Sequence, residues 1–263
     1  MIKKPQKGDR WSREEMIVVF NLYLRLPYGQ MDHRNKEVQA LATLMGRTEN
    51  SVAMRLNNFA ACDPMLKARG IKALGAQQKQ CQPYWDEFFS NQEKLVFESE
   101  RILAEYEELQ LEEKFKDVII DMPKDLRGEN KRREVQCRVN QNFFRKVILC
   151  NYDGKCALSG IDIKELLVAS HIIPWAVGQE ERLNPENGIC LSSLYDKSFD
   201  CGLISFNDDR TILFSSELER NCDKDYYERY FLPIKGHQLS QAVKYQPNPY
   251  FLKWHREHIF RGI

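Results

Sequence analysis

Long apolar runs and an excess of charge of one sign are both missing from this chain of 263 residues. No run approaches the roughly 18 apolar residues that span a bilayer, so we expect no membrane association. The N-terminal residues lack the apolar centre of a secretory signal, which favours a cytoplasmic location. The formal net charge of +1 does not indicate a nucleic-acid binder, so any such function depends on where the charges are placed.

Paired cysteine spacing is missing as well. The eight cysteines are spread from Cys62 to Cys222, several of them in apolar runs where a free thiol behaves as a small hydrophobe. In a cytosolic chain we expect these thiols to stay reduced and to form no disulfides. The composition, 43% apolar and 29% charged, is that of a globular protein, and the length allows two domains with their own cores.

The N-terminal part, residues 1–75, predicts three helices. Ser12 and Glu15 have the spacing of a capping box that opens the first helix. The second helix is expected to end at Gly46, and Thr48 is placed to cap the third. The second and third helices are thus joined by a tight turn from Gly46 to Thr48. This arrangement is a helix-turn-helix outline, which favours a DNA-recognition domain.

Polar residues at and after this turn are the candidate DNA contacts of the domain. Amides and guanidinium groups can hydrogen-bond base edges or phosphates, and we expect the third helix to expose them. The alternative is a three-helix bundle whose polar face meets only water or a partner protein. The candidates are Arg47, Asn50, Arg55, Asn57 and Asn58.

The connector, residues 76–123, predicts one long helix from Tyr84 to about Val118. Its apolar residues approximate a seven-residue repeat, and its outer face is rich in glutamate. Because DNA would repel an acidic face, we interpret this helix as a spacer or a dimerisation arm. A homodimer follows as a hypothesis.

The charge then changes sign. Basic residues gather just before the stretch that carries the chemistry, where they are well placed to bind phosphates, although a charge run is often only a solvated face. Lys124 and Arg127 begin the run. The candidate DNA contacts in it are Lys131, Arg132, Arg133, Arg138, Arg145 and Lys146.

Residues 166–192 predict two short strands joined by a polar loop. The apolar run 166–173 indicates the first strand, with His171 near its end. Asn187 and the glycine after it are a strong turn signal, since Asn tolerates left-handed backbone. The second strand follows over 189–191.

A helix after these strands carries two carboxylates. Asp196 and Asp200 are four residues apart and therefore lie one turn apart on the same helix face. Such a pair repels itself unless a cation lies between the two groups, and hard oxygen ligands suit Mg²⁺ or Mn²⁺. A neutral imidazole at His171 could be the base that activates a water.

Several short blocks in this order resemble the HNH nucleases, which share the ββα-metal fold. The resemblance covers roughly residues 130 to 260 and looks like a bacterial branch of HNH restriction endonucleases. The histidine and asparagine of the motif match His171 and Asn187, and its last ligand matches Asp196, 16 and 25 residues after the histidine. The blocks are 156–160, 170–175, 187–191 and 199–204.

The resemblance implies a metal-dependent endonuclease acting on double-stranded DNA, with a role in restriction or phage defence. His171 would be the base, Asn187 would fix the loop that aims it, and Asp196 with Asp200 would bind a divalent cation, Mg²⁺ or alternatively Mn²⁺. Ser170 stands where the family often has a metal-binding Asp or His, so it is a weak third ligand. Because no Cys-x-x-Cys pair occurs, we expect no structural zinc.

Each of these residues also has a structural interpretation. His171 could pack at the strand end, Asp196 could complete a capping box from Ser193, and Asp200 could cap the end of the helix. For the whole protein the alternatives are a DNA-binding regulator with an inactive HNH-like domain, which the weak ligand Ser170 favours, and an RNA nuclease.

The sequence thus predicts an α+β protein. A helix-turn-helix-like domain over 1–75 and a long connector helix over 76–123 precede a ββα-metal nuclease domain over 124–263. A hairpin over 203–215 is expected to extend the small sheet, and an aromatic-rich tail to complete the core. His255 and His258 could bind metal, although a solvated or core-edge pair fits them better.

Overall fold

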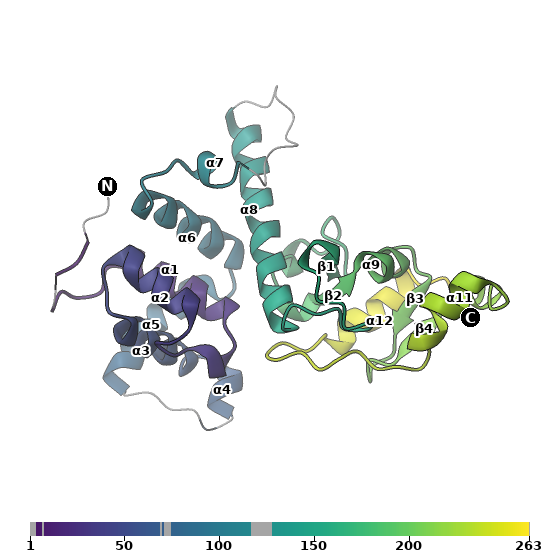
Figure 1. Cartoon of the computed structure of the whole chain (residues 1–263). Coiled ribbons are helices and arrows are strands. Elements are labelled where there is room, and N and C mark those ends of the chain that lie inside the picture. Colours follow the sequence, from purple (N-terminus) through teal and green to yellow (C-terminus); the bar gives the residue numbers. More distant parts are fainter. Residues whose placement is uncertain (1–3, 7, 69, 71–74, 117–127, 263) are drawn as a thin grey trace. The chain divides into compact units, whose positions relative to one another are not determined.

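The computed structural model describes residues 4–6, 8–68, 70, 75–116 and 128–262 (Figure 1). The chain divides into two compact units, Met1–Phe143 and Phe144–Ile263. Helices and two small antiparallel sheets make up the described residues, which agrees with a mixed α and β protein whose N-terminal part is helical. The boundary expected at 123/124 lies outside the described residues, and the three-part division stays a prediction.

The first three helices begin and end where local sequence signals place them. The helices are α1 (Arg13–Arg25), α2 (Lys36–Met45) and α3 (Glu49–Ala60). Both halves of the capping box between Ser12 and Glu15 are formed. Gly46 ends α2 in the left-handed region at φ 74°, and the Thr48 side chain accepts from the Ser51 amide to open α3. The helix-turn-helix outline is therefore present.

An aromatic cluster forms the core of this unit. Phe20 on α1 stacks on Phe59 of α3 with 4.7 Å between ring centroids. Trp85, on α5 (Gly75–Phe88), lies 5.4 Å from the Phe20 ring. Burial of these large rings holds α1, α3 and α5 together, and Figure 1 shows them side by side.

The prediction of a single long connector helix is wrong. The chain instead forms α5, α6 (Gln92–Tyr106) and α7 (Leu111–Lys114), after the short α4 (Pro64–Ala68). The Asn91 side chain accepts from the Lys94 amide and starts α6 as a new helix, and Glu108 adopts a left-handed φ of 59° between α6 and α7. Because α6 packs against α1, its apolar face is used inside the unit, and the described residues of the connector form no extended arm.

The second unit contains the predicted strands. The long helix α8 (Gly128–Asn151) is followed by β1 (Leu167–His171), β2 (Gly188–Ser192), α9 (Ser193–Asp200), β3 (Ile204–Phe206) and β4 (Ile212–Phe214). Three further helices are α10 (Ser216–Glu219), α11 (Asp225–Tyr230) and α12 (Pro249–His258). Among the described residues β3 and β4 form a sheet of their own, so the expectation that they extend the β1–β2 sheet is wrong.

The C-terminal helix α12 is fixed by a buried histidine. The His255 ring stacks on Phe199 at 3.7 Å, its Nδ1 lies 2.9 Å from Ser205 Oγ, and its Nε2 lies 3.1 Å from the Phe199 carbonyl oxygen. Burial lowers the pKa of His255 to about 4, so the ring is neutral. His258 lies exposed against Trp254. The histidine pair is thus a core residue and a surface residue.

No disulfide joins any of the eight cysteines, all of which lie in the described residues. None of the helices in the described ranges has both the length and the apolar character needed to cross a bilayer.

Candidate functional site

The hairpin of β1 and β2, followed directly by α9, forms the frame of the site (Figure 1). The two strands are antiparallel, with Ser170 opposite Ile189 and His171 opposite Gly188. Side chains of successive strand residues point to opposite faces, so Ser170 and His171 leave β1 on different sides. This alternation decides which neighbours each of them meets.

His171 packs on α8 and is held in one orientation. Its ring stacks on Phe144 with centroids 3.8 Å apart, and Trp175 meets it edge-on at 5.4 Å. Nε2 lies 3.0 Å from the Arg182 carbonyl oxygen. A carbonyl can only accept, so Nε2 carries the proton and Nδ1 is the basic nitrogen.

The electrostatics of His171 keep the ring neutral. Burial is the largest cause and lowers its pKa to about 4; the Arg182 carbonyl opposes this shift and the Arg182 guanidinium adds to it. At neutral pH the imidazole is therefore neutral, and its Nδ1 carries no proton and can act as a base.

Asn187 ties the loop between the strands to the end of β1. Its side chain is fully buried; Oδ1 accepts from the Ile173 amide at 2.8 Å, and Nδ2 donates to the carbonyls of Ile173 and Glu181, each at 3.2 Å. In addition, the Ile172 amide donates to the Asn187 carbonyl. The residue therefore fixes the chain on both sides of the loop.

The expected left-handed turn at Asn187 and Gly188 is wrong. Asn187 closes a short 3₁₀ helix, and Gly188 begins β2 in extended backbone at φ −135°. Gly188 is needed for space instead: a Cβ there would lie 2.4 Å from Ile148 Cδ1 and 2.7 Å from Phe144 Cζ. Close approach of α8 to the hairpin explains the glycine, and the same approach brings Phe144 onto His171.

The opposite face of the hairpin carries Ser170, Asp196 and Asp200. Burial raises the pKa of Asp196, while the Ser170 side chain and Lys197 lower it in part. Burial raises the pKa of Asp200 as well, and the charge of Asp196 adds to the shift. Asp196 is partly buried and Asp200 is exposed, and their two carboxylates repel each other, as expected for a pair that shares a cation.

Ser170 is 2% exposed, and its Oγ makes no hydrogen bond of normal geometry within the described part of the chain, although it faces Asp196. A buried hydroxyl without a hydrogen-bond partner costs free energy unless a water or a bound ligand interacts with its oxygen. Two carboxylates and this oxygen are donors that suit Mg²⁺ or Mn²⁺, which keep several water ligands. The residues fit a divalent cation.

The helix α9 is capped at Ser192 without a side-chain hydrogen bond, so Asp196 is not part of a capping box. Asp200 is the last residue of α9, and in the described residues no hydrogen bond involves its carboxylate. No hydrogen bond or ion pair between described residues joins His171 to either acid, and no three His, Cys, Asp or Glu side chains there form a ligand cluster.

Arg182 was not among the candidates. Its Nε donates to the Trp175 carbonyl at 2.8 Å, and its guanidinium carbon lies 5.2 Å from the Trp175 ring centroid. It stands beside His171 and is the nearest cation to that base. The signal in the sequence was a lone arginine in the loop between the candidate histidine and asparagine.

The basic candidates on α8 differ in what they do. The side chain of Arg145 donates to the carbonyls of Leu167 at 2.6 Å and Lys164 at 2.9 Å, so it anchors the start of β1. Arg133 and Arg138 pair with glutamates one turn earlier. Lys131, Arg132 and Lys146 are exposed.

The expected exposure of the third helix is wrong for three of its four candidates. Arg55 and Asn58 are 5% and 6% exposed, and the Asn57 amide donates to the carbonyls of Met31 and Ala53. They point inward because α3 packs between α1, α2 and α5. Asn50 is exposed.

Arg47 is likewise a structural residue. It forms an ion pair with the buried Glu15 at 2.7 Å and donates to the carbonyls of Asp9 and Arg10. Its guanidinium therefore stabilises the segment that leads into α1. These contacts use the N–H donors that would otherwise bind DNA.

Strand, loop, strand and helix, with a buried neutral histidine on the first strand and acids on the helix, define a ββα nuclease module. Residues 156–207 match the family model described as HNH endonuclease. The chain carries an HNH endonuclease domain, which confirms the predicted family and indicates nuclease activity. No match was found among the curated proteins.

Proposed function

We propose that this protein is a divalent-metal-dependent endonuclease that hydrolyses phosphodiester bonds of double-stranded DNA. The observation that carries the proposal is the state of His171: Nε2 donates to a carbonyl oxygen, and Nδ1 is left as a neutral base. The HNH match over the same residues supports it.

In this mechanism His171 Nδ1 accepts a proton from the water that attacks phosphorus. The bond from phosphorus to the 3′ oxygen breaks, and the leaving oxygen takes a proton from solvent, which gives a 5′ phosphate and a 3′ hydroxyl. Asn187 holds the loop that positions His171, and Arg182 would bind the scissile phosphate.

Asp196, Asp200 and Ser170 would hold the cation, Mg²⁺ or Mn²⁺. When bound, it would neutralise charge on the phosphate and stabilise the leaving oxygen. Ser170 and His171 leave β1 on opposite faces of the hairpin. One phosphate can therefore contact both the His171 ring and the cation near Ser170 only if it lies across the end of the hairpin.

Plasmid cleavage tests the proposal. The native protein with Mg²⁺ or Mn²⁺ should cut, and His171→Ala should be at least about 100-fold slower, since a general base contributes that much or more. His237→Ala is the matched control, because this exposed histidine lies outside the site. Cutting by His171→Ala at the native rate would exclude this base.

Ser170 is the observation that favours a second function, a DNA-binding regulator with an inactive HNH-like domain. DNA binding without cleavage over plasmid, modified DNA and structured RNA would support it. Cleavage of structured RNA alone would instead identify an RNA nuclease.

A restriction or phage-defence role rests on the family branch that the sequence blocks resemble. Lower plating efficiency of phage on cells that carry the native gene, but not His171→Ala, would support it. Two active sites in a homodimer would cut both strands. A mass of one chain in light scattering during plasmid cleavage would count against the dimer.

A further inference from the structure

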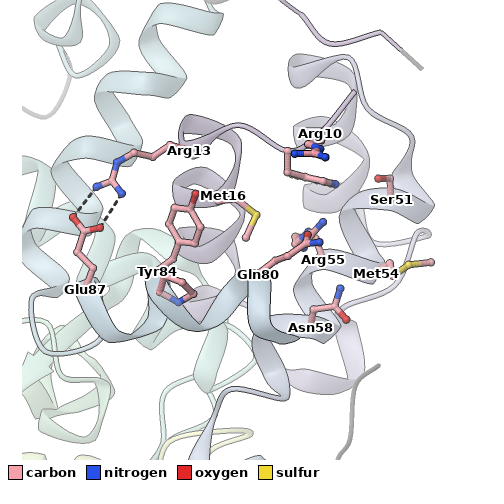
Figure 2. Close-up of a pocket in the computed structure, with 12 residues that line it drawn as sticks. Arg10, Arg13, Met16, Ser51, Met54, Arg55, Asn58, Gln80, Tyr84 and Glu87 are labelled. Atoms are coloured by element: carbon pink, nitrogen blue, oxygen red, sulfur yellow. Dashed lines mark hydrogen bonds and ion pairs between the residues drawn. The ribbon is translucent and has the colours of Figure 1, made fainter. Parts of the chain in front are cut away.

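A cavity of about 840 Å³ lies in the N-terminal unit, between α1, α3 and α5 (Figure 2). Three arginines contribute to its lining, Arg10, Arg13 and Arg55, whereas Glu87 is the carboxylate that lines it. Arg13 binds both oxygens of Glu87, at 2.8 and 2.6 Å, so these two charges cancel. The remaining lining charge is positive.

Arg55 is the main reason to expect a ligand. It is 5% exposed, and among the described residues it has no carboxylate partner. Its Nη1 donates to Gln80 Oε1 at 3.1 Å and lies 3.9 Å from Cys81 Sγ. Its guanidinium carbon lies 4.9 Å from the Trp11 ring centroid, and no hydrogen bond within the described ranges uses Nε or Nη2. A buried guanidinium without a counter-charge is costly, so an anion that enters the cavity gains from it.

Asn58 gives a second, independent indication. It lies one turn after Arg55 on α3, is 6% exposed, and lines the same cavity (Figure 2). The described residues supply no hydrogen-bond partner for its side-chain amide, which is open to the cavity and free to bond a ligand there. Ser51 adds a hydroxyl to the same lining.

We propose that this cavity binds a phosphate group, carried either by a nucleic-acid strand or by a free nucleotide. Arg55 would supply paired N–H donors that match two phosphate oxygens, as guanidinium groups do. The Asn58 amide would donate to a further oxygen, and the exposed Arg10 would add a charge at the same cavity. This inference places Arg55 and Asn58 in a pocket rather than on an exposed recognition surface.

The test uses the full chain carrying His171→Ala, with EDTA present, so that no cleavage can occur. Binding is measured by calorimetry at constant ionic strength, with inorganic phosphate, a deoxynucleoside monophosphate and a short oligonucleotide as probes. The decisive variant is Asn58→Asp, which keeps the shape of the side chain but places a carboxylate beside Arg55. It should keep the fold and weaken phosphate binding at least tenfold.

Arg10→Ala, at an exposed position that does not threaten folding, should weaken binding several-fold. Arg34→Ala is the matched control, since this arginine of the same unit is exposed and outside the cavity. Binding of phosphate or the mononucleotide identifies a free ligand, and binding of the oligonucleotide alone identifies a nucleic-acid strand. The proposal is overturned if no probe binds, or if both cavity variants bind like the control. Neither result depends on nuclease activity.

Discussion

At the scale of single residues, His171 illustrates how a fold makes a base. Stacking on Phe144 and burial favour the neutral ring, and the Arg182 carbonyl selects the tautomer. The sequence identified the residue from its place in a motif. The neighbours that set its proton come from α8 and from the loop, and no local pattern could have indicated them.

Titration of the histidines should show this environment directly. With a pKa lowered to about 4, the His171 ring should keep the NMR shift of neutral imidazole from pH 7 to pH 5 and titrate only near pH 4. The His171 resonance is assigned as the one that is lost in His171→Gln. If that resonance titrates near pH 6.5, the buried environment is contradicted.

The buried His255 makes stability depend on pH. Its folded pKa of about 4 lies below the unfolded value of about 6.5, so in between the unfolded chain binds a proton that the folded chain does not. The contribution of His255 to stability should therefore fall by roughly 2 to 3 kcal/mol as the pH drops from 6.5 to 4, on top of a similar contribution from His171. Urea unfolding across this range measures the unfolding free energy at each pH. If the dependence of this free energy on pH is the same in His255→Gln, the effect comes from another group.

Asn187 should be a positioning residue with a large effect. Its replacement by Ala removes three side-chain hydrogen bonds and leaves the Ile173 amide without its partner, for a loss of about 3 kcal/mol in unfolding free energy. Nuclease activity should fall with it. Asn184→Ala, in the same loop, breaks a cap and should cost about 1 kcal/mol. Equal losses in the two variants would contradict the role given to Asn187.

At the scale of elements, the approach of α8 to the hairpin decides the shape of the site. Gly188 permits that approach, since any side chain there would collide with Ile148 and Phe144. The sequence suggested a turn for this glycine because Asn-Gly is a local signal. The actual reason lies forty residues earlier in the chain, on another helix.

Gly188→Ala should therefore be destabilising by about 1 to 3 kcal/mol, the usual cost of overpacking. The cost should shrink when Ile148→Val removes the atom 2.4 Å from the new Cβ, which a double-mutant cycle measures by chemical denaturation. Gly29→Ala is the matched control, because nothing lies within 4 Å of a Cβ at that position. Additive effects of the two changes would contradict the proposed contact.

At the scale of the whole molecule, the two units allow the proposed ligands to be separated. Mg²⁺ should slow hydrogen exchange within residues 144–263, and phosphate within residues 1–143. Asp200→Asn should abolish the response to Mg²⁺ and, by removing a repelling charge next to Asp196, stabilise the metal-free protein. A Mg²⁺ response that persists in this variant would exclude Asp200 as a ligand.

By itself, the sequence determined the features that depend on near neighbours in the chain. The caps of α1 and α3, the strand that carries His171, the helix that carries Asp196 and the family of the nuclease domain all follow from short patterns. Such patterns reflect backbone preferences and motif spacing, which act over a few residues.

Only the tertiary structure decided what depends on residues far apart. The connector breaks and α6 packs on α1, Arg47 pairs with Glu15, and Arg55 with Asn58 faces a cavity. Polarity suggests exposure for such residues, but the free energy of burial depends on the partners that folding brings to them. Those partners come from other helices, which is why the positive cavity could not be read from the sequence.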